Sequence, residues 1–249
     1  EIPWDAGPWL QGDQFDAVMN YLLTFTCWSF FGGSRMDNQL VGHWRGHGEE
    51  YFVKDAQAFA NAVTQLQAKY PRQAMLAQLN LLDSHDTARF LSITGSKNAL
   101  RLATLFQMTY PGAPCVYYGN EVGMSGGKDP DCRRAFNWDE KSWDNDLRAY
   151  FKTCIALRKA LPALRDGAWN ILLADQGRFV YRRDKEDDTM VVALNNSDQT
   201  YHLDIALGGF SGSEIVFTDA LGAGTAVCRN GRLSGLSIPP FTGAALHRG

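Results

Sequence analysis

Residues 74–87 read Ala-Met-Leu-Ala-Gln-Leu-Asn-Leu-Leu-Asp-Ser-His-Asp-Thr, an apolar run that passes directly into a polar one. Residues 74–82 are too uniformly apolar for a strand with one exposed face, and they are typical of a strand covered on both faces. Residues 98–110 then predict a helix, residues 111–114 a turn, and residues 115–118 a second buried strand. This order predicts a parallel strand-helix-strand unit.

The flanking segments continue the alternation. Apolar residues recur at steps of three and four from Phe52 to Leu66, which predicts an amphipathic helix that ends before Pro71. A second such stripe predicts a helix over residues 145–161, before Pro162. On the N-terminal side, residues 15–21 favour a short buried strand, and the Gly-rich and aromatic residues 24–48 favour a long loop over a binding face.

Beyond Pro162 the apolar pattern changes to a period of two, which indicates strands. Runs of this kind are separated by turn-forming residues, and they predict a small antiparallel β-sandwich. We therefore expect two domains, residues 1–162 and residues 163–249. The predicted strands lie at residues 178–182, 189–194, 199–205, 214–217 and 243–247.

The first domain supplies three or four strands that alternate with helices, whereas a closed (β/α)8 barrel has eight. The fold class is therefore predicted as α/β, the C-terminal half of a TIM barrel followed by the β domain. An open half-barrel would leave strand edges unpaired, which natural proteins avoid. We expect the chain to pair with an N-terminal segment that it does not include, or to be a piece of a longer enzyme.

Composition narrows the class of partner. The formal net charge of −3 over 249 residues does not indicate binding to nucleic acid or to an anionic membrane. No apolar run approaches the length needed to span a bilayer. The five cysteines are scattered without a Cys-x-x-Cys pair, so we expect free thiols in a reducing cytoplasm and no metal ligands. A neutral or small-molecule partner fits this composition best.

His85 and Asp86 follow the predicted strand, where barrel enzymes carry their catalytic groups. Cleavage of a glycosidic bond uses two carboxyl groups around a transition state that resembles an oxocarbenium ion. Asp86 could serve there, and His85 could hydrogen-bond a sugar hydroxyl. A solvated loop pair, or a helix N-cap by Asp86, is the alternative.

Residues 81–89, Leu-Leu-Asp-Ser-His-Asp-Thr-Ala-Arg, closely resemble the fourth signature region of the α-amylase superfamily, glycoside hydrolase family 13. The form is that of its neopullulanase, cyclomaltodextrinase and maltogenic amylase branch. The resemblance implies that His85 binds the sugar at the cleavage point and that Asp86 stabilises the transition state. It also implies that no cofactor is required, while a structural calcium ion is possible.

Residues 1–5, Glu-Ile-Pro-Trp-Asp, resemble the third region of the same family, usually Glu-Ile-Trp-His-Asp, and residues 8–21 support the alignment. The resemblance implies that Glu1 is the general acid/base. Pro3 and Trp4 replace Trp-His, which alters the neighbourhood that would raise the pKa of such an acid. A frayed terminus without a role is the alternative for Glu1.

Residues 117–134 resemble the same branch, and this implies that Asp129 and Arg133 lie at donor-side subsites. A salt bridge that pins the loop is the alternative. Some tryptophans could also stack on glucose rings, although most aromatic side chains of this kind belong to a core. The candidates are Trp4, Trp9, Trp28, Trp44 and Trp138.

The family's nucleophile lies within Gly-x-Arg-x-Asp, a string that does not occur here. Without it the retaining reaction cannot begin, so we expect the isolated chain to be inactive. The complete form is expected to cleave α-1,4 and also α-1,6 bonds of maltooligosaccharides, cyclodextrin, starch or pullulan with retention, and a homodimer is possible. Transglycosylation stays open, as does a catalytically silent relative that acts as a carbohydrate-binding or structural body.

Overall fold

A computed structural model describes residues 3–52, 55–210 and 214–248. Its N-terminal part is built on parallel segments that alternate with helices. Strand β1 (Leu79–Leu81) pairs in parallel with β2 (Ala113–Cys115), and on its other side Leu79 forms a parallel bridge with Met19. The predicted strand-helix-strand unit and the predicted class, half of an α/β barrel, are confirmed.

The strands are shorter than predicted. Residues 74–82 do not form one strand, because Arg72–Ala77 form helix α4 and only Leu79–Leu81 pair as β1. Alanine, glutamine, methionine and leucine are good helix formers, and the preceding Pro71 favours a helix start. Strand β2 begins within the predicted turn, and residues 15–21 contribute a single bridge at Met19.

The long loop predicted over residues 24–48 is wrong, because Tyr21–Gly32 form helix α1. All its residues are buried, and the Asn20 side chain caps it by accepting the N–H of Leu23. A helix that is covered on every side shows no apolar stripe, so its sequence carries no helical period.

Three helices agree with prediction: α3 (Ala56–Ala68), α6 (Lys97–Thr109) and α7 (Asn145–Ala160). Each begins after a side chain that caps its first turn, namely Asp55, Ser96 and Asp144. Pro162 both ends α7 and begins α8. Short helices join these elements: α2 (Asn38–Val41), α5 (Phe90–Thr94), α8 (Pro162–Asp166), and 3-10 helices at Gly7–Trp9, Gly33–Arg35, Gly42–Gly46, Glu49–Tyr51, Asn120–Val122, Asp131–Arg133 and Glu140–Ser142.

The C-terminal part is an antiparallel β domain, as predicted. Its strands form one continuous sheet in the order β3-β4-β5-β10-β7-β8-β9-β6, and the end strands β3 and β6 contact each other. The predicted runs fall on β4, β5, β6, β7 and β10, whereas β3, β8 and β9 were not predicted. The bounds are β3 (Ala168–Asp175), β4 (Arg178–Lys185), β5 (Asp188–Asn195), β6 (Tyr201–Ala206), β7 (Ile215–Asp219), β8 (Thr225–Arg229), β9 (Arg232–Ile238) and β10 (Thr242–Arg248).

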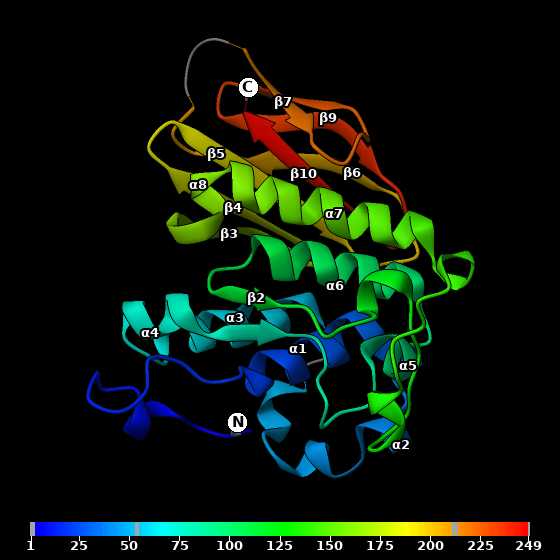
Figure 1. Ribbon diagram of the computed structural model, residues 1–249. Coiled ribbons are helices and arrows are strands. Elements are labelled where there is room, and N and C mark those ends of the chain that lie inside the picture. The colour runs from blue at the N-terminus through cyan, green and yellow to red at the C-terminus, as the bar shows by residue number, and fades with distance from the viewer. Residues whose placement is uncertain (1–2, 53–54, 211–213, 249) are drawn as a thin grey trace.

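One apolar core joins the two parts. Figure 1 shows α6 between the β1-β2 pair and the strands of the β domain. The Phe59 ring of α3 lies 5.1 Å from Phe106 of α6 and 5.0 Å from Phe179 of β4, measured between ring centroids. The β domain therefore supports the helices that hold β1 and β2 in place.

Candidate active site

The residues that follow β1 form a short turn that ends at α5. The Ser84 N–H donates to Thr87 Oγ1 over 3.0 Å, and the Asp86 N–H donates to Ser84 Oγ over 3.1 Å. These local bonds close the turn and leave His85 and Asp86 at its outer side, with exposed side-chain fractions of 43% and 29%. Both residues stand at the carboxyl end of the strand.

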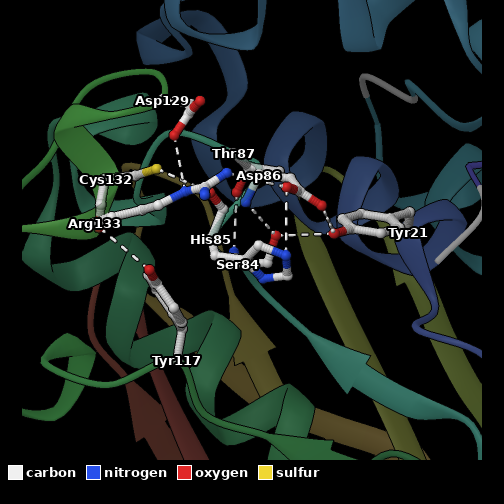
Figure 2. A network of polar contacts seen from close by, with 9 residues as sticks. All are labelled: Tyr21, Ser84, His85, Asp86, Thr87, Tyr117, Asp129, Cys132 and Arg133. Carbon is white, nitrogen blue, oxygen red and sulfur yellow. Dashed lines mark hydrogen bonds and ion pairs between the residues drawn. The ribbon is translucent and has the colours of Figure 1, made fainter.

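The Asp86 carboxylate is held from two sides (Figure 2). The Tyr21 hydroxyl donates to Oδ2 over 3.3 Å. On the other side, His85 Nε2 lies 3.4 Å and Arg133 Nη2 lies 3.5 Å from Oδ1. The carboxylate therefore has a defined orientation and still reaches solvent, as a group that contacts a substrate must.

Asp129 and Arg133 lie on the loop after β2, which reaches over to the His85-Asp86 turn (Figure 2). Arg133 Nε donates over 2.8 Å to the main-chain oxygen of His85 and lies 2.8 Å from Asp129 Oδ1. The salt bridge that pins the loop is thus formed, and the same guanidinium also faces Asp86. The structure brings four candidate residues together: His85, Asp86, Asp129 and Arg133.

Glu1, the fifth candidate, lies outside the described residues, so its role as acid/base stays a prediction. Trp4 is described and half exposed, and its ring centroid lies 6.3 Å from that of His47.

Beneath the turn lies a buried carboxylate, Asp83, which is 1% exposed. Its Oδ2 accepts the Phe90 N–H over 2.6 Å, and its Oδ1 accepts Asn120 Nδ2 over 2.5 Å. Burial raises the pKa of Asp83 to about 6, although these two hydrogen bonds and the nearby Arg89 charge act in the opposite direction.

Comparison with known proteins places these residues in a family. The model of the α-amylase catalytic domain matches residues 3–159. The chain belongs to the α-amylase family. A model of the neopullulanase-like C-terminal domain matches residues 169–246.

Similar proteins and solved structures support the same family assignment. A cyclomaltodextrinase from a Bacillus species is 41% identical over 85% of this chain, and neopullulanase 2 from Thermoactinomyces vulgaris is 38% identical over 100% of it. Among solved structures, a Thermus thermophilus protein covers 100% of the chain with a TM-score of 0.86 and 37% identity. A debranching enzyme from Nostoc punctiforme covers 99% with a TM-score of 0.85 and 31% identity.

The chain spans only part of these proteins. It covers 35% of the Bacillus relative, 40% of the Thermoactinomyces relative, and 51% and 50% of the two solved chains. The four residues that the structure brings together are therefore a candidate site, in a chain that spans about half or less of these relatives.

Sequence reasoning missed Tyr21, whose hydroxyl contacts Asp86 and lies 2.9 Å from Ser84 Oγ. This residue was assigned to a strand, but it is the first residue of α1, and its ring stacks on Trp44 at 5.3 Å between centroids. The helix-capping Asn20 was the sequence feature that could have revealed the helix start.

The tryptophan candidates divide by exposure. Trp28 is fully buried, and its indole N–H donates to the main-chain oxygen of Leu82 over 2.6 Å, so it is a core residue that cannot stack on a sugar. Trp9 and Trp138 are exposed by 38% and 79%.

Within the described ranges, no group of three or more His, Cys, Asp or Glu side chains could hold a metal ion, and the possible structural calcium stays a prediction. No helix in those ranges is long and apolar enough to cross a membrane.

Proposed function

We propose that this chain is the C-terminal part of an α-glucan hydrolase that cleaves α-1,4 glucosidic bonds with retention, with α-1,6 bonds as further candidates. The observation that carries the proposal is the Asp86 carboxylate, oriented by Tyr21 and Arg133 at the carboxyl end of a barrel strand. The names of the relatives, cyclomaltodextrinase and neopullulanase, support cyclodextrin and pullulan as substrates, beside maltooligosaccharides and starch.

Asp86 would act electrostatically. Positive charge develops on the sugar ring as the glycosidic bond breaks, and a fixed carboxylate stabilises that charge without having to reorganise. His85 would donate a hydrogen bond to a sugar hydroxyl beside the bond, and Arg133 with Asp129 would shape the adjacent subsite.

The remaining chemistry is divided between Glu1 and residues outside this chain. Glu1 would protonate the leaving oxygen, and a nucleophile supplied by the complementary half of the barrel would form the covalent intermediate. The chain alone would therefore not turn over substrate. A homodimer of the complete form and a cytoplasmic location also belong to the proposal.

The test compares the longer gene product, this chain alone and the Asp86→Asn variant of the longer product on cyclodextrin and pullulan. We expect turnover by the longer product, none by the chain alone, and a loss of kcat of about 1,000-fold or more in Asp86→Asn. Asp55→Asn is the control, because Asp55 caps α3 away from the site and asparagine caps equally well. An Asp86→Asn variant with the wild-type rate would refute the role of Asp86.

The second candidate is a catalytically silent relative that binds glucans. It is favoured by Pro3 and Trp4, which stand where the family usually has Trp-His after its acid/base. It predicts that the longer product binds cyclodextrin in calorimetry but hydrolyses neither substrate.

A further inference from the structure

Asp83 stands three residues before Asp86 and joins two loops that are distant in sequence. Its oxygens accept the N–H of Phe90, at the start of α5, and the side-chain N–H of Asn120, in the turn after β2. The carboxylate is buried under the exposed turn that carries His85 and Asp86. It therefore lies at the base of the site and does not face a substrate.

The neighbours of Asp83 fix which groups donate and which accept. Asn120 Nδ2 points to Asp83, while Asn120 Oδ1 lies 3.4 Å from Arg89 Nη1, which also donates to the Tyr118 oxygen over 2.7 Å. The fully buried Arg89 guanidinium lies over the Tyr117 ring at 4.6 Å from its centroid. Asp83 therefore faces an N–H donor at each oxygen and acts as an acceptor toward both loops.

The exposed contacts of Arg133 join the same two loops as Asp83 does. Arg133 Nε donates to the His85 oxygen, and Arg133 Nη2 faces Asp86, so both contacts cross between the same two loops. We propose that Asp83 is a positioning residue for Asp86: it fastens residues 83–90 to residues 117–134 and so sets the placement of Arg133 against the Asp86 carboxylate. The consequence for catalysis rests on the proposed function, whereas the consequence for loop order does not.

The surroundings of Asp83 also fix the direction of its response to pH. The charged or titratable groups near Asp83 are Arg89 and Cys115, and the pKa of the Cys115 thiol is raised by its burial and then by the charge of Asp83. Because burial raises the pKa of Asp83 in the folded state, a fall in pH opposes opening of the two loops. The connection is therefore tested by substitution at constant pH.

The matched pair of variants is Asp83→Asn and Asp219→Asn. Asp219 is 4% exposed in the β domain, and its two oxygens accept the N–H groups of Ala223 and Ala245 over 2.7 and 2.6 Å. Either substitution replaces one acceptor by a donor that faces an N–H group. The pair therefore separates loss of a buried double acceptor in general from loss of this one.

The first experiment is hydrogen exchange on this chain at about pH 7.5, followed by mass spectrometry. We expect exchange within residues 83–90 and 117–134 to be about tenfold faster in Asp83→Asn than in the wild type, and unchanged in Asp219→Asn. Asn120→Ala removes only one of the two donors and should accelerate exchange in the same segments, which tests the connection if Asp83→Asn does not fold. Wild-type exchange rates in both segments of the folded variant overturn the inference.

The second experiment is steady-state kinetics of the longer gene product. We expect Asp83→Asn to lower kcat by about 10- to 100-fold with a much smaller change in KM, since misplacement of a group that acts in the transition state affects kcat first. Asp219→Asn should retain wild-type kcat. If the wild type hydrolyses no glucan, the proposed function fails while the exchange experiment still decides the role of Asp83. A wild-type kcat in Asp83→Asn overturns the positioning role.

Discussion

Asp83 and Asp86 are three residues apart, yet their carboxylates lie in contrasting surroundings. The carboxylate of Asp86 is partly exposed and faces Arg133, whereas the carboxylate of Asp83 is buried, and burial dominates its pKa. A buried carboxylate held ionised at neutral pH costs folding free energy. Asp83 therefore lowers the stability of the fold at neutral pH, while its two hydrogen bonds connect the loops beneath the candidate site.

The cost of burying Asp83 predicts how the free energy of unfolding changes with pH. The folded-state pKa of about 6 lies above the ordinary 3.8, so in the window between these values folded Asp83 binds more protons than unfolded Asp83. The contribution of Asp83 to the free energy of unfolding is fully present below pH 3.8 and is lost as the pH rises through about 6. From about pH 7.5 to about pH 5, urea denaturation should show the wild type gaining about 1.4 kcal/mol relative to Asp83→Asn. A difference between the two proteins that does not change with pH would contradict a raised pKa.

The grouping of the candidate site residues was predictable where chemistry and position coincide in sequence. His85 and Asp86 follow an apolar run, and Asp129 and Arg133 are spaced to form an ion pair, which the structure contains. Tyr21 was not predictable in this way, because its contact with Asp86 depends on how α1 packs against β1. Asp83 was overlooked because its sequence does not reveal that both oxygens meet donors on other segments.

At the scale of elements, agreement depended in part on whether one face of an element meets solvent. Helices α3 and α7 each have an exposed face, and their apolar stripes predicted them. Helix α6 was also predicted, although its residues from Leu102 onward are all buried. Helix α1 has none and was taken for a loop. Strand β9 was missed because Gly235, with a φ of +98°, interrupts its alternation, and β1 and β2 are too short for a period to appear.

The turn before β2 depends on a glycine. Gly112 has a φ of +110°, and a Cβ there would overlap the Asn80 amide, which links the segments around β1: Asn80 Nδ2 donates to the Pro111 oxygen over 2.7 Å, and Oδ1 accepts from Asn20 over 2.9 Å. Gly222→Ala is the control, since Gly222 has a φ of +90° with open space around it. Gly112→Ala should therefore lower the free energy of unfolding by about 1–3 kcal/mol more than Gly222→Ala. Equal losses in the two variants would show that Asn80 moves aside freely.

At the scale of the molecule, the two parts share one core. The cluster that contains Phe59 and Phe106 continues into Phe179, Tyr181 and Val192 of the β domain. The barrel portion has little sheet of its own in the described residues, so the β domain supplies much of the apolar surface that α3 and α6 bury. We therefore expect the whole chain to unfold in a single transition, with coincident curves from circular dichroism and tryptophan fluorescence.

Arg183 of β4 adds polar contacts between the two parts, and its substitution tests whether the apolar core couples them. Its fully buried guanidinium donates to the main-chain oxygens of Thr109, at the end of α6, and of Leu164 and Gly167, around α8. Burial lowers its pKa to about 10, so it stays charged at neutral pH. Arg183→Met removes the guanidinium donor from the Thr109 and Gly167 oxygens, while the Leu164 oxygen still accepts from Arg158. We expect it to cost about 3 kcal/mol or more while unfolding remains a single transition.

Arg229→Met, which removes an exposed ion pair between β8 and Glu214, the residue before β7, should change stability little. If Arg183→Met instead produced two separate transitions, the link between the parts would reside in this one side chain. A single transition at lower denaturant would show that the apolar core carries the coupling and that Arg183 stabilises both parts together. That second outcome is the one expected, because the ring contacts from Phe59 to Phe179 do not involve the guanidinium.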